Sequence, residues 1–171
     1  MALVSVIIPY FGKKSFIQKT LTSVLNQTFQ DFEIILIYDD ENKDDLVYIK
    51  KILNENSKVK IIDNKKNLGA GLSRNLGIKK SSGSIIAFLD ADDYWLPHLL
   101  EKLYRAMNKN PKAALAFGSF NYISQDGNYL DAEASVNYLD RYESGLEAPH
   151  GACTLIDRKK FLAEGLYFED V

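Results

Sequence analysis

The sequence predicts an α/β domain built on a mainly parallel β-sheet that is flanked by helices. Short apolar runs rich in β-branched residues alternate with segments whose apolar residues recur at helical spacing, from the N-terminus to about residue 110. Strands and helices that alternate in this way favour a parallel sheet with helices on both faces. The chain has 171 residues, of which 46% are hydrophobic, so it can bury one substantial core.

Four apolar runs are predicted as buried strands, because each is short and rich in β-branched residues. They cover Val4–Ile8, Glu33–Tyr38, Val59–Ile62 and Ser84–Leu89. Pro9 directly follows the first run and marks its end.

Four helices are predicted after these strands. The first begins at Ser15, which stands three residues before Gln18 at the spacing of a capping box, and continues to about Asn26. Asp44 is the expected N-cap of the second helix. The other three helices cover Leu46–Leu53, Gly71–Lys80 and a segment that begins at Pro97 and continues to about Met107.

The pattern is weaker after about residue 110. Ala113–Ser124 is strand-like, and Asp126-Gly127 is a typical hairpin-turn pair. Asp131–Pro149 is polar and weakly periodic, so we expect a mobile loop over a functional site. A further strand is expected at Thr154–Ile156 and a short helix at Lys159–Leu162.

The composition excludes several classes of protein. The net charge is −2, which does not indicate a nucleic-acid-binding protein. The doubled lysines are dispersed, which favours a solvated surface and leaves open a role at an anionic ligand or membrane surface. No apolar window is long enough to span a membrane, and no signal peptide is evident. We therefore expect a cytoplasmic protein, with peripheral association at the inner face of the membrane as an open alternative.

The single cysteine, Cys153, excludes an intrachain disulfide and fits a reducing compartment. We expect it to be a small buried hydrophobic residue. The alternative is a catalytic thiol paired with His150, three residues earlier, and His150 itself is either structural or part of a site.

Carboxylates follow two of the predicted strands. Asp39 and Asp40 come directly after the second, and Asp90, Asp92 and Asp93 come directly after the fourth. Ligands of parallel α/β sheets bind outside the carboxyl ends of the strands, and an all-oxygen cluster there suits Mg²⁺ or Mn²⁺ with a phosphate ligand. The alternatives are helix caps, for which a single aspartate would suffice.

A glycine-bearing segment, Asn67–Gly71, opens the third predicted helix. Its glycines permit close approach of a ligand to the backbone, and a helix N-terminus favours anions. Arg74, one turn further, could face the same cleft, although a plain loop is the alternative. Tyr94 and Trp95, after the acidic cluster, either stack on a sugar or base or pack in the core.

Several motifs recur together in a characteristic order. They are Val4–Tyr10 (VSVIIPY), Ser23–Thr28 (SVLNQT), Asp39-Asp40, Asn67–Gly69 (NLG), Ser73–Ile78 (SRNLGI) and the segment from Gly83 through Phe88–Asp93 (FLDADD). As an ordered set, they resemble the N-terminal catalytic domain of family 2 glycosyltransferases. Two departures from that family are Glu41-Asn42, where Gly-Ser is usual, and Phe11-Gly12, where an asparagine is common.

The resemblance implies a Rossmann-like GT-A fold over residues 1–171 as a single domain. Residues 1 to about 110 would form the nucleotide-sugar-binding half, and about 111–171 would begin the acceptor-side half, incomplete at the C-terminus. The implied enzyme is an inverting glycosyltransferase of polysaccharide or glycolipid synthesis. It would move a sugar from a nucleotide-sugar, UDP in the first instance, to a hydroxyl of a saccharide or lipid-linked acceptor.

The resemblance also implies roles for individual residues. Asp170, in a late Glu-Asp pair, would be the catalytic base. Asp92, with Asp90, would bind Mg²⁺ or Mn²⁺, and Asp90 would also lie by the ribose. The substrate-binding residues would be Pro9, Tyr10, Asp39, Asp40, Asn67, Gly69, Arg74, Asp90 and Ala91.

Three competing interpretations stay open at this point. A nucleotidyltransferase would carry a glycine-rich basic loop after the first strand, whereas Tyr10–Lys14 has one glycine. A phosphoacceptor receiver domain would place its acidic pair after the first strand instead of the second. A third possibility is a fragment that binds nucleotide-sugar and lacks activity by itself.

Overall fold

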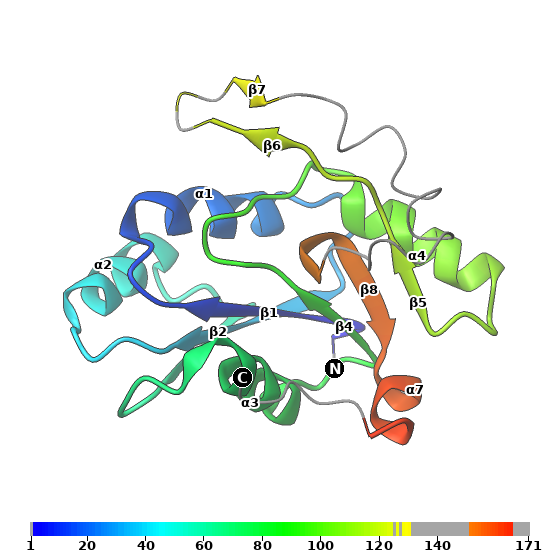
Figure 1. Cartoon of the computed structure of the whole chain (residues 1–171), viewed down its shortest axis with the longest axis horizontal. Coiled ribbons are helices and arrows are strands. Elements are labelled where there is room, and N and C mark those ends of the chain that lie inside the picture. Colours follow the sequence, from blue (N-terminus) through cyan, green and yellow to red (C-terminus); the bar gives the residue numbers. More distant parts are fainter. Residues whose placement is uncertain (1, 125, 127, 131–150, 166–171) are drawn as a thin grey trace.

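A six-stranded sheet forms the centre of the computed structural model, which describes residues 2–124, 126, 128–130 and 151–165 (Figure 1). The strands are β1 (Val4–Tyr10), β2 (Phe32–Tyr38), β3 (Val59–Asp63), β4 (Ile85–Phe88), β5 (Leu115–Phe117) and β8 (Thr154–Asp157). Their order across the sheet is β3-β2-β1-β4-β8-β5.

The first four strands pair in parallel, as the sequence predicts. Val4 to Tyr10 of β1 lies beside Phe32 to Tyr38 of β2, and Val4 to Ile7 also lies beside Ile85 to Phe88 of β4. The strand β8 pairs antiparallel with both β4 and β5, so the sheet is mixed at one end. The predicted α/β fold with a mainly parallel sheet is therefore confirmed.

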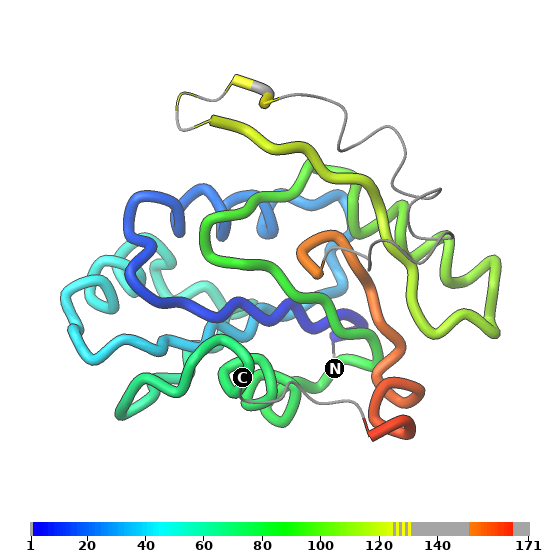
Figure 2. The backbone as a smooth tube through the Cα atoms, viewed as in Figure 1, coloured from blue at the N-terminus to red at the C-terminus, as the bar shows by residue number. Residues whose placement is uncertain are grey.

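Helices cover both faces of the sheet, and the path of the chain between layers can be followed in Figure 2. The helices are α1 (Lys14–Leu25), α2 (Asp44–Leu53), α3 (Gly69–Lys80), α4 (Leu99–Lys109) and α7 (Arg158–Ala163). The first, second and fourth pack on one face, where Ile17, Ile49 and Leu100 are completely buried. The third and α7 pack on the other, against Ile7 and Ile37.

Burial of the strand side chains supplies most of the driving force for this arrangement. Residues Val6, Ile7 and Ile8 are completely buried, and successive side chains point to opposite faces of the sheet. Each fully buried aliphatic side chain contributes about 1.5–3 kcal/mol relative to exposure. A strand with both faces covered must therefore be apolar throughout, which explains why periodicity two is absent from these runs.

The N-termini of two helices differ from the predictions. Lys13 occupies the N-cap position of α1, and no side chain caps that helix, so Ser15 lies inside the first turn and the predicted capping box is wrong. Asp44 is the first residue of α2 rather than its cap, and its N–H donates to the side chain of Asn42. The acidic first turn of α2 is nevertheless favourable, because negative charge there complements the helix dipole.

The strand predicted at Ala113–Ser124 is two short strands. After β5 the chain leaves the sheet at Gly118, whose N–H donates to the carbonyl of Cys153, and forms β6 (Tyr122–Ile123). β6 pairs antiparallel with β7 (Tyr129–Leu130), as the turn signal predicts. The predicted loop at Asp131–Pro149 lies outside the described residues, as does His150.

A polar network closes the amino end of the sheet. The carboxylate of Glu33 accepts hydrogen bonds from the hydroxyls of Ser5 and Ser82 at 2.7 and 2.8 Å and from the Ser82 N–H. Arg158 donates to the carbonyls of Ser81 and Ile78 at 2.8 and 3.0 Å, which ties α7 to the end of α3. These bonds satisfy backbone groups between the end of α3 and the start of β4.

In the part of the chain that the structure describes, no helix combines the length and the apolar character that crossing a bilayer requires.

Candidate functional site: a cleft at the carboxyl ends of the strands

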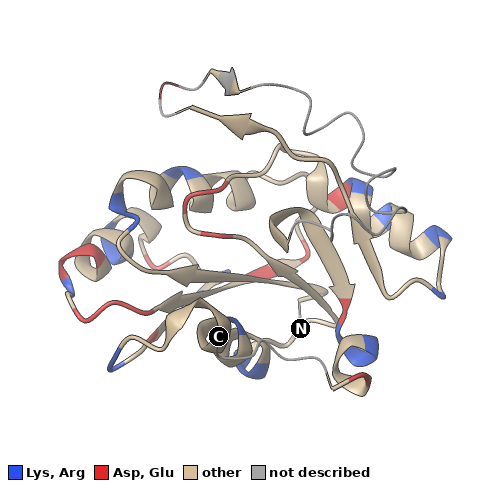
Figure 3. Cartoon of the chain, in the orientation of Figure 1, with Lys and Arg blue, Asp and Glu red and all other residues tan. Residues whose placement is uncertain are grey.

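A cleft of about 440 Å³ opens beside the carboxyl ends of β1, β2 and β4. Its walls come from the last residues of β1, from residues that follow the three strands, and from the start of α3 with the loop before it. They are Pro9, Tyr10, Phe11, Lys13, Asp39, Asn67, Gly69, Ala70, Arg74, Asp90, Ala91 and Asp92. Figure 3 shows the acidic segments after β2 and β4, with a basic segment at the start of α1.

Asp39 holds the loop that leads into α3. It is 3% exposed, and its carboxylate accepts hydrogen bonds from the Asn64 side chain at 2.7 Å and from the N–H groups of Leu68 and Gly69 at 2.9 Å. Gly69 has a φ of +83°, a left-handed conformation that suits glycine. The buried carboxylate therefore shapes the wall of the cleft formed by Asn67 and Gly69.

Asp90 and Asp92 are each paired with a basic side chain in the cleft. Asp90 accepts a hydrogen bond from the guanidinium of Arg74, and Asp92 lies 2.7 Å from the ammonium of Lys13. The bond with Asp92 raises the pKa of Lys13, which is charged throughout the neutral range. Basic side chains of the protein itself thus relieve the repulsion between these two carboxylates.

The segment that follows β4 is fixed by polar side chains of α1 and of Gln27, just after its end. Ser23 accepts the N–H of Trp95 at 3.0 Å, and Gln27 donates to the Leu96 carbonyl at 2.7 Å while accepting the Leu100 N–H at 3.0 Å. One turn earlier, the Thr20 hydroxyl donates to the Ala91 carbonyl. Thr20 therefore fixes the backbone just before Asp92, and the Ser23–Thr28 motif fixes the backbone from Trp95 onward.

Two stacked tyrosines support the floor of the cleft. The rings of Tyr10 and Tyr38 lie 5.1 Å apart, and the Tyr10 hydroxyl donates to Asp45 at 2.7 Å. Burial, together with this bond, raises the pKa of Tyr10, and burial with the nearby charge of Asp40 raises the pKa of Tyr38 to about 12. Both rings are neutral at physiological pH and act as apolar packing with fixed hydroxyls.

A second cavity, of about 190 Å³, adjoins the cleft because Asp92 lines both. Tyr94, Leu96, Phe120 and Tyr122 contribute apolar walls. Trp95 also borders it but is largely buried and donates its indole N–H to the carbonyl of Ala152, in agreement with a core role.

Cys153 is a buried structural residue in this arrangement. Its thiol donates to the carbonyl of Gly118 at 3.0 Å, and burial raises its pKa. A thiol with a raised pKa is a poor nucleophile, so the structure favours the packing interpretation over a catalytic one.

The structure brings most of the predicted substrate residues together. The cleft is lined by Pro9, Tyr10, Asp39, Asn67, Gly69, Arg74, Asp90, Ala91 and Asp92. In the described part of the chain, Asp40 does not line it; its side chain accepts the N–H of Asn42 instead. Asp170 lies outside the described residues.

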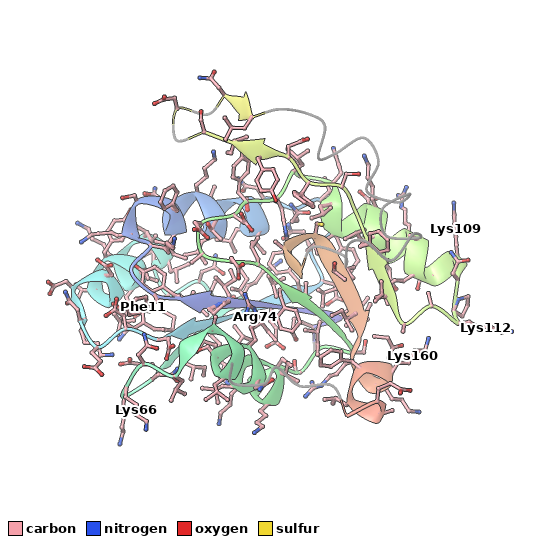
Figure 4. All side chains as sticks on the ribbon, viewed as in Figure 1. Phe11, Lys66, Arg74, Lys109, Lys112 and Lys160 are labelled. Carbon is pink, nitrogen blue, oxygen red and sulfur yellow. The ribbon has the colours of Figure 1, made fainter. Side chains whose placement is uncertain are left out.

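Three cleft residues were not predicted from the sequence: Phe11, Lys13 and Ala70. Phe11 is 57% exposed, and Figure 4 labels it beyond the end of β1, with Arg74 on α3. The sequence signal for Phe11 is an aromatic residue followed by a glycine directly after a buried strand, at the sheet edge where ligands bind.

The donor set of the cleft fits a magnesium- or manganese-type cation. Among the described residues, no group of three or more His, Cys, Asp or Glu side chains is arranged to hold a metal ion. Mg²⁺ characteristically takes one or two protein carboxylates and completes its coordination with phosphate oxygens and water. The carboxylate of Asp92, which faces a cationic ammonium at 2.7 Å, is a side chain of this kind.

The fold and this cleft define an α/β protein with a ligand-sized cleft at the carboxyl ends of parallel strands, and comparison with known proteins identifies the family. The sequence profile of Glycosyl transferase family 2 matches residues 5–162. This chain therefore belongs to glycosyl transferase family 2, as the ordered motifs indicated.

Curated relatives support the assignment. The chain is 34% identical over 125 residues to WfgD of Escherichia coli, a UDP-Glc:alpha-D-GlcNAc-diphosphoundecaprenol beta-1,3-glucosyltransferase, covering 72% of this chain and 48% of WfgD. It is 31% identical over 163 residues to TuaG of Bacillus subtilis, a putative teichuronic acid biosynthesis glycosyltransferase, covering 92% and 63%. The chain thus spans about half to two thirds of the length of these two relatives.

Solved structures show the same fold. TarS 1-349 of S. aureus in complex with UDP-GlcNAc has a TM-score of 0.75 at 19% identity, over 98% of this chain and 48% of TarS. The mannosyltransferase PcManGT of Pyrobaculum calidifontis, in complex with GDP-Man and Mn²⁺, has a TM-score of 0.71 at 13% identity, over 95% and 46%. The Rossmann-like GT-A fold expected from the sequence is therefore confirmed.

Proposed function

We propose that this chain is the donor-binding part of an inverting glycosyltransferase that uses a nucleotide-sugar, UDP-linked in the first instance, and a divalent cation. The observation that carries this proposal is the cleft itself. It combines an exposed aromatic ring, a carboxylate-held glycine loop and two acidic residues beside two basic ones. Relatives that act on UDP-Glc or were crystallised with UDP-GlcNAc or GDP-Man support the same class of donor.

We assign the nucleoside to the Phe11 side of the cleft. Phe11 offers an open aromatic face on which a base can stack, and base–aromatic stacking contributes about 1–3 kcal/mol. Pro9 and the loop held by Asp39 would border the base, with the exposed Asp90 carboxylate available to a ribose hydroxyl. Phe11 stands where the resemblance showed a departure, so this pocket is expected to be specific to the chain.

We assign the diphosphate to the Asp92 side. When bound, the divalent cation would supply positive charge against the diphosphate leaving group. Asp92, with Asp90, would hold that cation. The positive charges of Arg74 and Lys13 would offset the negative charges of the two aspartates, which would otherwise repel an anionic ligand.

We place the acceptor on the far side of Asp92, in the second cavity. Apolar and aromatic walls from Tyr94, Phe120 and Tyr122 suit the faces of a sugar ring. Phe120 and Tyr122 also belong to the acceptor-side half of the chain, which starts at about residue 111. Asp170, in the complete protein, would take the proton of the acceptor hydroxyl as it attacks the anomeric carbon. A saccharide or lipid-linked saccharide is the acceptor class, as in the reaction named for WfgD.

Calorimetry with UDP tests the donor site. We expect binding to require Mn²⁺ or Mg²⁺, and Asp92→Ala to weaken it far more than Asp45→Ala, because Asp45 contacts Tyr10 and Lys14 instead of the cleft. Equal affinity for UDP with and without a chelator would count decisively against the proposal. In the complete protein, Asp170→Asn should lower kcat by about 10²–10⁴-fold at unchanged UDP affinity.

Two alternatives would give different results in the same assays. A nucleotidyltransferase would release pyrophosphate from a nucleoside triphosphate, and its activity would not depend on an acceptor saccharide. A fragment without transfer activity would bind UDP with metal and yet show no turnover until the complete protein is assayed.

A further inference from the structure

We propose that Lys13 is an exchangeable counter-ion that holds Asp92 before the metal binds and moves to the diphosphate of the donor afterwards. Lys13 would thereby couple the binding of the divalent cation to the binding of the nucleotide. The proposal rests on the proposed function, since it takes Asp92 to be the residue that holds the cation.

The backbone of Lys13 is fixed while its side chain can move. Its carbonyl accepts the N–H groups of Phe16 and Ile17 at 3.0 Å, which begins α1. Its ammonium lies 2.7 Å from Asp92, and the two side chains are 45% and 38% exposed. An ion pair this exposed contributes little to stability, so another ligand can displace it readily.

The charge balance of the cleft gives this pair a function. The buried carboxylate of Asp39, which also lines the cleft, is held by neutral donors from Asn64, Leu68 and Gly69. The other two carboxylates, Asp90 and Asp92, are each paired with one basic group, and these four side chains sum to zero before any ligand binds. A divalent cation that reaches Asp92 meets the positive charge of Lys13 on the same carboxylate. Because like charges at contact distance repel, the ammonium must leave before the cation is held well.

The displaced ammonium has a new anionic partner in the same cleft. Lys13 lines the same cleft as Phe11, to which we assign the nucleoside, and contacts Asp92, to which we assign the diphosphate side. Lysine binds phosphate as a mobile point charge, whereas the planar guanidinium of Arg74 favours a fixed carboxylate geometry. Lys13 is therefore better suited than Arg74 to change partners.

The neighbouring lysine provides a matched control. Lys14 lies 3.1 Å from Asp45 and 5.7 Å from the centre of the Tyr48 ring, and it does not line the cleft. The two adjacent lysines thus carry the same charge at similar exposure but have different partners. Any effect of charge alone should appear in both.

The test measures Mn²⁺ binding without nucleotide, by the fluorescence of the single tryptophan, Trp95, and by electron paramagnetic resonance of free Mn²⁺. We expect Lys13→Met to tighten Mn²⁺ binding about three- to tenfold, since the competing cation is gone. We expect Lys14→Met to change it by less than about twofold, and Lys13→Arg to retain the wild-type affinity or weaken it.

The second measurement is UDP affinity at saturating Mn²⁺. Here Lys13→Met should weaken binding about tenfold, because the freed ammonium no longer meets the diphosphate. The factor by which Mn²⁺ and UDP enhance each other, which is reciprocal, should therefore fall in this variant. Tighter Mn²⁺ binding together with weaker UDP binding in the same variant is the result expected of a counter-ion that changes partners.

Three results would overturn the inference: unchanged or weaker Mn²⁺ binding in Lys13→Met, equal tightening in Lys14→Met, or Mn²⁺ binding undetectable in both the wild type and Lys13→Met. Asp92→Asn separates this failure from that of the proposed function. If Asp92→Asn leaves Mn²⁺ and UDP binding intact, the metal site itself is wrong. If it abolishes binding while Lys13→Met has no effect, the metal site stands and the exchange does not occur.

Discussion

The two ends of the sheet use the same residue types in different ways. At the amino end, the Glu33 carboxylate accepts hydrogen bonds from short, rigid partners, the Ser5 hydroxyl and the Ser82 N–H and hydroxyl. At the carboxyl end, Asp90 and Asp92 are paired with the long side chains of Arg74 and Lys13. Short partners lock a carboxylate in place, whereas long, exposed partners leave it able to accept another ligand.

Arginines show the same difference. Arg158 donates to the backbone carbonyls of Ile78 and Ser81, which cannot move without disrupting α3. Arg74 reaches from α3 to a side chain that is 43% exposed. We therefore infer that the polar side chains at the amino end stabilise the fold and that those at the carboxyl end form a binding surface. Substitutions can separate the two roles.

The largest stability effect is expected from Gly83→Ala at the amino end. A Cβ there would lie 2.7 Å from the Ser5 hydroxyl, 2.8 Å from the Ser5 nitrogen and 2.9 Å from the Leu3 carbonyl. Two of these atoms belong to backbone that cannot yield, so we expect a loss of about 2–3 kcal/mol in the free energy of unfolding. Urea unfolding followed by circular dichroism measures it.

Gly69→Ala, at the cleft, is the matched comparison. A Cβ there meets nothing within 4 Å, and only the φ of +83° opposes it, so the expected loss is about 1 kcal/mol. If Gly69→Ala were as destabilising as Gly83→Ala, the assignment of rigidity to the amino end would be wrong.

A smaller effect, with a defined pH dependence, is expected from Glu33→Gln. Burial raises the pKa of Glu33, but hydrogen bonds from Ser5 and Ser82 outweigh it, so the pKa lies below its ordinary value of 4.5. A lowered folded-state pKa adds stability above the unfolded-state value, and that stability is lost as the pH falls through the folded-state pKa. We expect Glu33→Gln to lower the free energy of unfolding by about 1–2 kcal/mol at pH 7, and this loss to become smaller below pH 4.5.

Asp90→Asn provides the comparison at the carboxyl end of the sheet, because the ion pair of Asp90 with Arg74 is partly exposed. We expect it to change stability at pH 7 by less than about 1 kcal/mol. Unfolding curves at pH 7 and pH 3.5 for both variants give the comparison, and a loss for Asp90→Asn as large as that for Glu33→Gln would remove the distinction between the two ends.

Much of the central sheet could be predicted from the sequence for a physical reason. Parallel strands buried on both faces must be apolar and β-branched, so Val4–Ile8 and Glu33–Tyr38 are visible in isolation. The insertion of β8 between β4 and β5 could not be predicted in this way, because it depends on pairing between residues about 70 positions apart, such as Ile86 and Ile156.

For the candidate site, the sequence identified most but not all of the residues that line the cleft. The rule that ligands bind at the carboxyl ends of strands placed Asp39, Asp90 and Asp92 at one edge, and all three line the cleft. The rule does not say which member of an adjacent pair faces the ligand, so Asp40 was included although it turns toward Asn42. Lys13 was missed because its role depends on a contact with a residue 79 positions away in the sequence.

The smallest effect tests whether every carboxylate at the cleft end belongs to the binding surface. The hydrogen bond from Tyr10, with the charge of Lys14, lowers the pKa of Asp45 against the opposing effect of burial. The stability that this carboxylate adds is therefore present at neutral pH and lost as the pH falls below its ordinary value of 3.8. We expect Asp45→Asn to cost about 0.5–1 kcal/mol at pH 7, since the amide oxygen still accepts from Tyr10, and to leave affinity for UDP with Mn²⁺ unchanged. Thermal unfolding between pH 3 and pH 7 and calorimetry with UDP measure the two quantities. If Asp45→Asn lowered UDP affinity without lowering stability, Asp45 would have to be assigned to the binding surface of the cleft instead of to its structural support.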